Sequence, residues 1–184
     1  MELLRSNEMI YYSLLTLGFI GVFDEAYFHQ YKGNILKRRE CFFENTLHLL
    51  RSYCFSAIFF IFALFEFSGG YTFILIALFM IDLMVGAFDI LVEEKSREFQ
   101  GGLNRFEYLT HMILSFHLGV LYVNLVPYLY ESLLKTPSIS FTIPELFVDQ
   151  VLLLLGLGTF VYSIYQSFIL IKVYQGRKLI IVEN

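Results

Sequence analysis

The chain has 184 residues, of which 57% are hydrophobic and 16% charged, and its mean hydropathy is +0.63. This composition is too apolar for an ordinary soluble domain and predicts an all-α integral membrane protein with a single domain over residues 1–184. The formal net charge is −4, so the chain lacks the basic surface that nucleic acids require. Nucleic acid is therefore excluded as a partner, and membrane lipids are expected instead.

Five apolar runs predict membrane-spanning helices, since each is close to the roughly 20 residues that cross a bilayer. They cover about residues 9–28, 42–65, 71–92, 106–130 and 147–173. A tight turn at Ser68-Gly69-Gly70 separates the second run from the third, and a polar segment with Pro137 and Pro144 precedes the fifth. The two cysteines, Cys41 and Cys54, have no metal-binding spacing and are expected to be buried thiols.

The cations predict an orientation, because short cytoplasmic loops are rich in Lys and Arg. Most of them follow the first, third and fifth runs: Lys32, Lys37, Arg38, Arg39, Lys95, Arg97, Arg105, Lys172, Arg177 and Lys178. Only Arg5 and Lys135 fall on the other side. The N-terminus is therefore expected outside and the C-terminus in the cytoplasm, in a bacterial inner membrane.

The first four predicted helices contain one pattern twice. A Phe-Asp pair ends an apolar run at Phe23-Asp24 and again at Phe88-Asp89, and a Glu-x-x-x-His sequence opens the next run each time. Repeat one covers about residues 9–66 and repeat two about residues 71–130. The two hairpins would run parallel and could pack about a two-fold axis as a four-helix bundle. The fifth helix has no counterpart and is expected to flank this bundle.

Each of the four helices carries a pair of candidate metal ligands four residues apart, a spacing that places both side chains on one helix face. The pairs are Glu25 and His29, Glu44 and His48, Asp89 and Glu93, and Glu107 and His111. Mixed carboxylates and imidazoles suit iron, manganese or zinc. Bundles that hold two irons use a comparable set, with Glu-x-x-His in place of Glu-x-x-x-His. The sequence predicts two metal ions, with iron preferred over zinc or manganese.

The two copies do not match perfectly. Aligning Asp24 with Asp89 matches His29 to Glu94, whereas Glu93 shares a helix face with Asp89. Either the helix is distorted there or only one pairing binds metal, so Asp24 and Glu94 stay as further candidates. The deeper residues Asp82 and His117 are expected at matching depth, as a supporting pair or a proton route.

Catalytic roles are assigned by residue type. Glu44 or Glu94 is the candidate general base, and Arg51 and Arg97 would orient the ligands. A competing interpretation makes the acids and histidines ion-pair partners of the nearby arginines at the level of the lipid headgroups. Duplication of the pattern favours the metal site.

Two resemblances are found. The first four predicted helices resemble an uncharacterised group of small bacterial integral membrane proteins, which implies a bacterial inner-membrane protein and no particular activity. The residues that carry this resemblance are Phe23-Asp24-x-x-Tyr27-x-His29, Arg39-Glu40, Glu44-x-x-x-His48-x-x-Arg51, Asp89-x-x-x-Glu93-Glu94-x-x-Arg97 and Glu107-x-x-x-His111. Glu93-Glu94-Lys95-Ser96-Arg97 resembles the paired-glutamate and arginine motif of the CAAX-type intramembrane proteases. Here two residues, not three, separate the glutamates from the arginine, and the Phe-x-x-x-His motif of that family is missing.

Three functions follow from this pattern. The first is a dinuclear iron oxidoreductase that acts on a lipid or another apolar substrate near the cytoplasmic face. The second is a zinc-dependent intramembrane hydrolase, in which the metal lowers the pKa of a bound water. The third is a membrane scaffold or accessory subunit without enzyme activity.

Overall fold

A computed structural model describes the backbone of residues 2–182 and the side chains of residues 8–176. The side chains of Arg5, Arg177 and Lys178, which were used to predict the orientation, therefore lie outside the described residues. In chain order the elements are α1 (Glu2–Phe23), the π-helix η1 (Asp24–Lys32), η2 (Ile35–Lys37), α2 (Phe42–Leu64), β1 (Phe65–Ser68), η3 (Gly69–Tyr71), α3 (Thr72–Ser96), η4 (Glu98–Gln100), α4 (Arg105–Leu133), β2 (Ser138–Phe141) and α5 (Phe147–Val182).

The five long helices agree with the five predicted runs, usually to within a few residues. Five described segments are long and apolar enough to cross a membrane: Glu8–Lys32, Phe42–Leu64, Gly69–Ser96, Arg105–Leu133 and Phe147–Gly176. Local signals explain some of their boundaries. The side chain of Asn104 accepts a hydrogen bond from the backbone N–H of Phe106 at 2.9 Å and so caps the start of α4.

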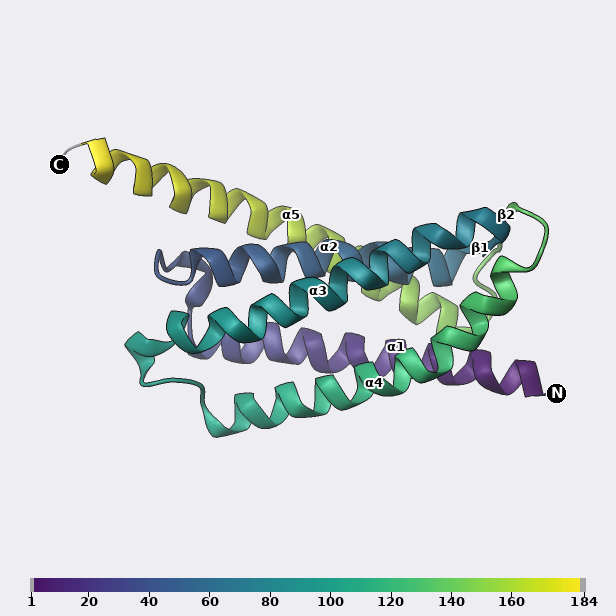
Figure 1. The fold of residues 1–184 in the computed structure, drawn as a ribbon. Helices are drawn as coiled ribbons and strands as arrows, with labels where there is room; N and C mark the ends of the chain where they lie inside the picture. The colour runs from purple at the N-terminus through teal and green to yellow at the C-terminus, as the bar shows by residue number, and fades with distance from the viewer. Residues whose placement is uncertain (1, 183–184) are drawn as a thin grey trace.

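Helices α1 and α3 run in one direction and α2 and α4 in the other, as the repeat predicts (Figure 1). Among these four helices the closest pairs nevertheless join the two repeats, since α1 packs along α4 and α2 packs along α3. Helix α5 packs along α2 and also contacts α1. The sequence assigned α5 only a flanking position, but its extensive contact with α2 makes it a full member of the helix assembly.

A two-stranded antiparallel sheet joins the connections at the N-terminal end of the molecule (Figure 1). Strand β1 pairs with β2 from Phe65 opposite Phe141 to Ser68 opposite Ser138. Gly69 follows with a φ of +57°, and a Cβ there would lie 2.6 Å from the backbone of Pro137. The turn at Gly69 was predicted, whereas its pairing with the distant segment around Pro137 was not.

Apolar and polar residues are distributed in an unusual way. One half of the helix assembly has an apolar core that includes Leu14, Phe62, Phe79 and Leu125. Large apolar side chains such as Phe88 and Phe116 point outward, with exposed fractions of 59% and 69%. The other half buries carboxylates, histidines and an arginine between the helices.

Candidate metal centre

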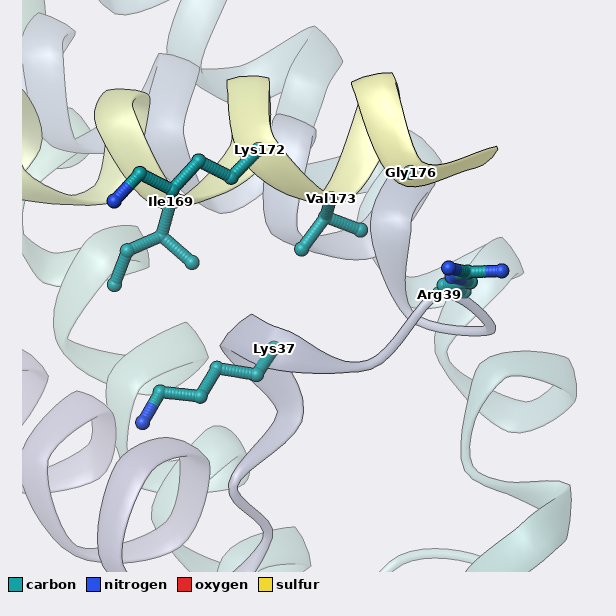
Figure 2. A pocket seen from close by; sticks show the side chains of 6 residues that line it. All are labelled: Lys37, Arg39, Ile169, Lys172, Val173 and Gly176. Atoms are coloured by element: carbon teal, nitrogen blue, oxygen red, sulfur yellow. The ribbon is translucent and has the colours of Figure 1, made fainter. Parts of the chain in front are cut away.

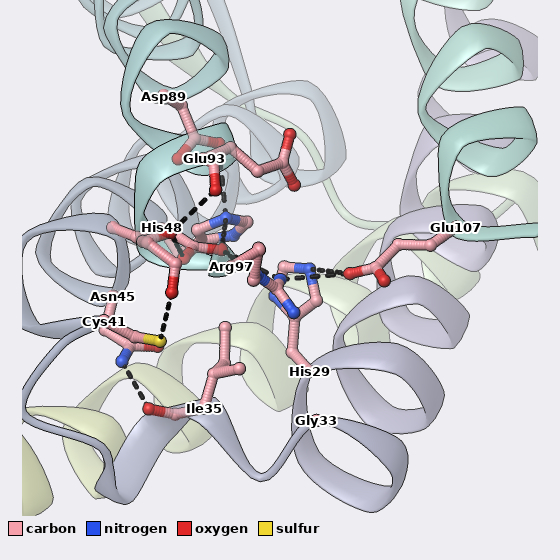
Figure 3. Close-up of polar contacts among 12 residues, drawn as sticks. His29, Gly33, Ile35, Cys41, Asn45, His48, Asp89, Glu93, Arg97 and Glu107 are labelled. Atoms are coloured by element: carbon pink, nitrogen blue, oxygen red, sulfur yellow. Dashed lines mark hydrogen bonds and ion pairs between the residues drawn. The ribbon is translucent and has the colours of Figure 1, made fainter. Parts of the chain in front are cut away.

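All eight predicted metal ligands lie in one cluster, at the end of the helices opposite the small sheet. They come from four elements: η1 supplies Glu25 and His29, α2 supplies Glu44 and His48, α3 supplies Asp89 and Glu93, and α4 supplies Glu107 and His111. Figure 3 shows the centre of this cluster, with the side chains of His29, His48, Glu93 and Glu107 converging from different helices. We call these eight residues, with Asp24, Arg51, Asp82 and Arg97, the polar cluster.

The π-helix η1 accounts for the mismatch between the two repeats. Hydrogen bonds from residue i to i+5 make a wider turn than in an α-helix, and π-turns are frequent at functional sites. In η1 both preceding acids therefore reach His29: Asp24 Oδ2 lies 3.5 Å from Nε2 and Glu25 Oε2 lies 3.2 Å from Nδ1. In repeat two the helix stays α-helical, so Glu93 is buried in the cluster and Glu94 is exposed. The one-residue slip corresponds to this local widening.

The two repeats exchange equivalent contacts. Asp24 of repeat one lies 3.3 Å from Nε2 of His111 in repeat two, and Asp89 of repeat two lies 3.2 Å from Nε2 of His48 in repeat one. The second nitrogen of each histidine also faces a glutamate. Nδ1 of His111 is 3.4 Å from Glu93, and Nδ1 of His48 is 3.9 Å from Glu25. The duplicated pattern thus produces two similar sets of ligands side by side.

Among the described residues, two groups of donor atoms are compact enough to hold a metal ion. One consists of Glu25, His29 and His48, and the other of His29, Glu93, Glu107 and His111, with all donor atoms of a group within 4.8 Å of one another. Ligands that bind one ion at about 2.0–2.2 Å are separated from each other by roughly 3 Å. The 3.2 Å between His29 and Glu25 and the 3.4 Å between His111 and Glu93 are close to this value. His29 belongs to both groups.

Arg97 binds ligands of both repeats. Its guanidinium group lies 2.8 Å from Glu44 and 3.0 Å from Glu107, which are equivalent positions in the two copies. The other oxygen of Glu44 accepts a hydrogen bond from Ser96. Burial alone would lower the pKa of Arg97, but the carboxylates of Glu44 and Glu107 raise it above its ordinary value, so the side chain is charged. Both carboxylate oxygens of Glu44 are therefore bonded to protein groups, which fits an orienting role better than direct binding of a metal ion.

Arg51 contacts two acids of α3, Asp82 and Asp89. Its Nε donates to Asp82 at 3.0 Å, and Nη1 lies 3.6 Å from Asp89, the partner of His48. The guanidinium group of Arg51 packs against Gly86, where a Cβ would lie 3.4 Å from the guanidinium carbon, an ordinary contact distance. The expected contact between Asp82 and His117 is not formed in the described part of the chain. Asp82 is paired from α2 instead, and His117 lies half-buried against Phe116.

Helix α5 contributes residues that the sequence analysis did not assign to the site. Tyr162 and Gln166 donate hydrogen bonds of 2.7 and 2.9 Å to Oε1 of Glu25, and Gln30 adds a third at 2.9 Å. These bonds leave Oε2 of Glu25 turned towards His29 and His48. The spacing of four residues between Tyr162 and Gln166 was the available signal, but nothing in the sequence places that face against η1.

The cluster carries more negative charge than its own cations balance. Seven carboxyl groups face two guanidinium groups, which leaves an excess of five negative charges while the histidines are neutral. Uncompensated buried charge costs several kcal/mol per group. Both nitrogens of His29, Nε2 of His48 and Oε1 of Glu93 are also buried without a hydrogen-bond partner. Bound divalent cations would satisfy the charge and these atoms together, so the residues fit a metal centre.

One candidate, Glu94, and the two cysteines lie apart from the cluster. Glu94 is exposed and makes none of its ion pairs, so the described geometry gives it no catalytic contact. Cys41 and Cys54 are buried free thiols, as expected, and burial raises the pKa of Cys41 to about 11. The Cys41 thiol donates to the backbone oxygen of Ser96 at 3.4 Å and has no role as a metal ligand in this arrangement.

No known protein family, curated protein or solved structure matches the chain. The chemistry of the cluster must therefore be inferred from its own geometry.

Proposed function

We propose that the chain is a membrane-embedded dinuclear metal protein, and that its metal is iron used for oxidation of a lipid or another apolar substrate. The observation that carries this proposal is His29, which faces both ligand groups and whose two nitrogens are buried without a hydrogen-bond partner. In a neutral His29 one nitrogen can donate its proton to Glu25, but the buried lone pair of the other nitrogen is left without a partner when no metal is bound.

The contacts suggest which ligands would bind each of the two metal ions. A neutral imidazole has one N–H and one free lone pair. Glu25 lies 3.2 Å from Nδ1 of His29 and is itself held by Tyr162, so it suits the acceptor of that proton. Nε2 of His29 would then join Glu93, Glu107 and His111 at one ion. Glu25, His48 and Asp89 would serve the other, with the arginines holding Glu44 and Asp89 in place.

Iron bound by carboxylates and imidazoles would supply oxygen-dependent oxidation chemistry. The chain's part is to hold the ligands and to leave one approach open. His111 and His48 keep exposed side-chain fractions of 23% and 13%, while Glu44 and His29 are almost completely buried. Beside His111, the exposed side chains of Tyr108 and Met112 on α4 are apolar or aromatic, with exposed fractions of 60% and 55%. This approach suits a substrate that arrives from the bilayer.

The membrane assignment follows from the same distribution of residues. Apolar side chains cover the outside of the helices and charged ones lie between them, the reverse of a soluble protein. We infer five membrane spans in a bacterial inner membrane, with the polar cluster near the cytoplasmic face. The helix ends and the connection at that end carry Lys32, Lys37, Arg38, Arg39 and Lys95, in accord with the rule that short cytoplasmic segments are positive.

Zinc-dependent hydrolysis is a weaker candidate because of its general base. Glu44 is bonded to Arg97 and Ser96, and Glu94 lies outside the cluster. A hydrolase would therefore need a base other than the two expected from the sequence. The identity of the bound metal separates the two chemistries, since iron supports oxidation and zinc supports hydrolysis.

The test is elemental analysis of the detergent-purified protein after loosely bound ions are removed without a strong chelator. The wild type is compared with His29→Ala, which removes the residue shared by both groups, and with His117→Ala, which removes a histidine of α4 outside the cluster. We expect about two equivalents of iron in the wild type and in the His117 variant, following the two-metal sites of helical bundles. The His29 variant should lose most of its metal.

Other results would contradict the proposal in distinct ways. Stoichiometric zinc would replace oxidation by hydrolysis as the chemistry of the site. No stoichiometric metal in any of the three proteins would make the polar cluster a network of buried ion pairs, and the scaffold interpretation would then stand.

A further inference from the structure

A groove lies between η2 and the C-terminal part of α5, outside the polar cluster. It has a volume of about 400 Å³ and is lined by Lys37, Arg39, Ile169, Lys172, Val173 and Gly176. Figure 2 shows the side chains of Lys37 and Lys172 extending to the same side from opposite walls, with Ile169 between them and Arg39 beside Gly176 at the other end. Two cationic groups therefore stand at one end of the groove and a third at the other.

The cations of the groove have no acidic partner. Lys37, Arg39 and Lys172 are exposed, and none of them forms an ion pair among the described residues, where Lys135, Arg51 and Arg97 do. No Asp or Glu among the described residues lines the groove. Three like charges around one hollow repel each other, and a bound anion relieves that repulsion. Phosphate is the anion that Lys and Arg side chains hold most readily in proteins.

The remaining lining favours a lipid over a free phosphate ion. Ile169 and Val173 give the groove an apolar floor, and Phe168 and Ile171 on the adjoining faces of α5 are 64% and 53% exposed. The groove also lies at the end of Phe147–Gly176, the segment of α5 long enough to cross a membrane. A site at this level, basic at its rim and apolar along its floor, matches a phospholipid, and basic pockets between helices at the cytoplasmic side bind anionic headgroups.

We propose that this groove binds the phosphate group of an anionic phospholipid, with Lys37 and Lys172 holding the phosphate and the apolar side of α5 receiving an acyl chain. A zwitterionic headgroup is disfavoured, because the described lining of the groove offers no carboxylate to its ammonium group. The site does not depend on metal in the polar cluster. It lies close to it along the chain, since Gln166, which bonds Glu25, precedes Ile169 by one helical turn.

The experiment measures thermal unfolding of the purified full-length protein in micelles of an uncharged detergent. Phosphatidylglycerol, phosphatidylcholine or inorganic phosphate is added at equal phosphate concentration. A ligand that binds the folded state raises Tm in proportion to the logarithm of its concentration. We expect phosphatidylglycerol alone to raise Tm of the wild type by several degrees. Lys37→Gln with Lys172→Gln should lose that shift.

A matched control separates the groove from general charge effects. Lys95→Gln also removes a cation from an exposed position at the same end of the molecule, but it leaves the groove intact, so its shift should equal that of the wild type. A second variant, Ile169→Trp, fills the groove without changing charge. Ile169 lies between the side chains of Lys37 and Lys172 (Figure 2), so the larger side chain should abolish the shift as well.

Three outcomes would overturn the proposal. Equal shifts with the anionic and zwitterionic lipids would show only general solvation of the apolar helices. An equal shift with inorganic phosphate would assign the groove to the free ion. A full shift retained in both the double lysine variant and Ile169→Trp would place the lipid elsewhere. Metal content, measured on the same samples, should stay unchanged in every variant, so failure here is distinct from failure of the metal proposal.

Discussion

Arg97 shows how a single side chain can hold two halves of a site together. It is 1% exposed and touches Glu44 from one repeat and Glu107 from the other. Arg97→Ala would leave both carboxylates buried without their cation, which typically costs about 3–5 kcal/mol. We therefore expect a fall of this size in the free energy of unfolding, measured by titrating the detergent-solubilised protein with sodium dodecyl sulfate.

The control for this prediction is Arg105→Ala, because Arg105 is exposed and forms no ion pair in the described part of the chain. Its effect should stay within about 0.5 kcal/mol. Adding Glu44→Gln to Arg97→Ala removes one of the two buried carboxylates left without a cation. The double variant should therefore recover part of the lost free energy of unfolding. A cost for Arg97→Ala no larger than that of the control would show that the two carboxylates do not depend on this cation.

Tyr162 is expected to act on the metal through Glu25. Its hydroxyl donates to the glutamate at 2.7 Å, and partners of this kind usually change metal affinity by about 10–100-fold when removed. Tyr162→Phe should lower metal affinity by a factor in this range, measured by competition with a chelator, while the helix content stays the same. Tyr165→Phe is the matched control, since Tyr165 is half-exposed on the next turn of α5 and makes no hydrogen bond to the cluster. Equal affinities for the two variants would remove Tyr162 from the site.

At the level of elements, the π-helix η1 and the loop that follows it position His29. The loop turns at Gly33, whose N–H donates to the backbone oxygen of Phe28 at 2.8 Å. A Cβ on this residue would lie 2.8 Å from that oxygen and 3.3 Å from Nη1 of Arg97. Gly33→Ala should therefore displace either the end of η1 or Arg97, at a cost of about 1–3 kcal/mol.

The same unfolding titration measures this cost, and Gly119→Ala provides its control. Gly119 lies inside α4 with no neighbouring atom within 4 Å of a Cβ, so alanine there should be neutral or stabilising by up to about 1 kcal/mol. The metal content of Gly33→Ala should also fall, because η1 carries His29 and Glu25. An unchanged metal content together with unchanged stability would mean that the loop adapts without moving η1.

The elements that could be predicted from the sequence are those with a local signal. The apolar runs predicted all five long helices. The spacing of Glu44 and His48, and of Glu107 and His111, predicted which side chains share a helix face. The bonds of Tyr162 to Glu25 and of Arg51 to Asp82 were not foreseen, because they join helices whose neighbours are set by packing across the whole chain. The π-helix has no residue pattern of its own that a sequence could reveal. Its only sign was the mismatch of the two repeats by one residue, in which His29 aligns with Glu94 instead of Glu93.

At the level of the whole molecule, the charges gather at the end that holds the polar cluster. The loops after α1 and α3 lie there, and the N-terminus and the β1–β2 sheet lie at the opposite end (Figure 1). Arg97 should be left out of the count of topogenic charges, because Glu44 and Glu107 neutralise it in the folded protein. Lys32, Lys37, Arg38, Arg39 and Lys95 still outnumber Lys135 at the other end. The proposed orientation therefore does not depend on Arg97.

This orientation can be measured with introduced cysteines, because the two native thiols are buried and should not react with a labelling reagent. Cys41 and Cys54 are 0% and 5% exposed, and a pKa of about 11 keeps Cys41 protonated at neutral pH, where thiolate reactions are slow. Ser140→Cys places a thiol on exposed β2, and Glu98→Cys places one on exposed η4. A membrane-impermeant maleimide should label Ser140→Cys in intact cells and Glu98→Cys only after the membrane is opened. The reverse result would put the polar cluster on the outer side, where a substrate and a reductant from the cytoplasm could not reach it directly.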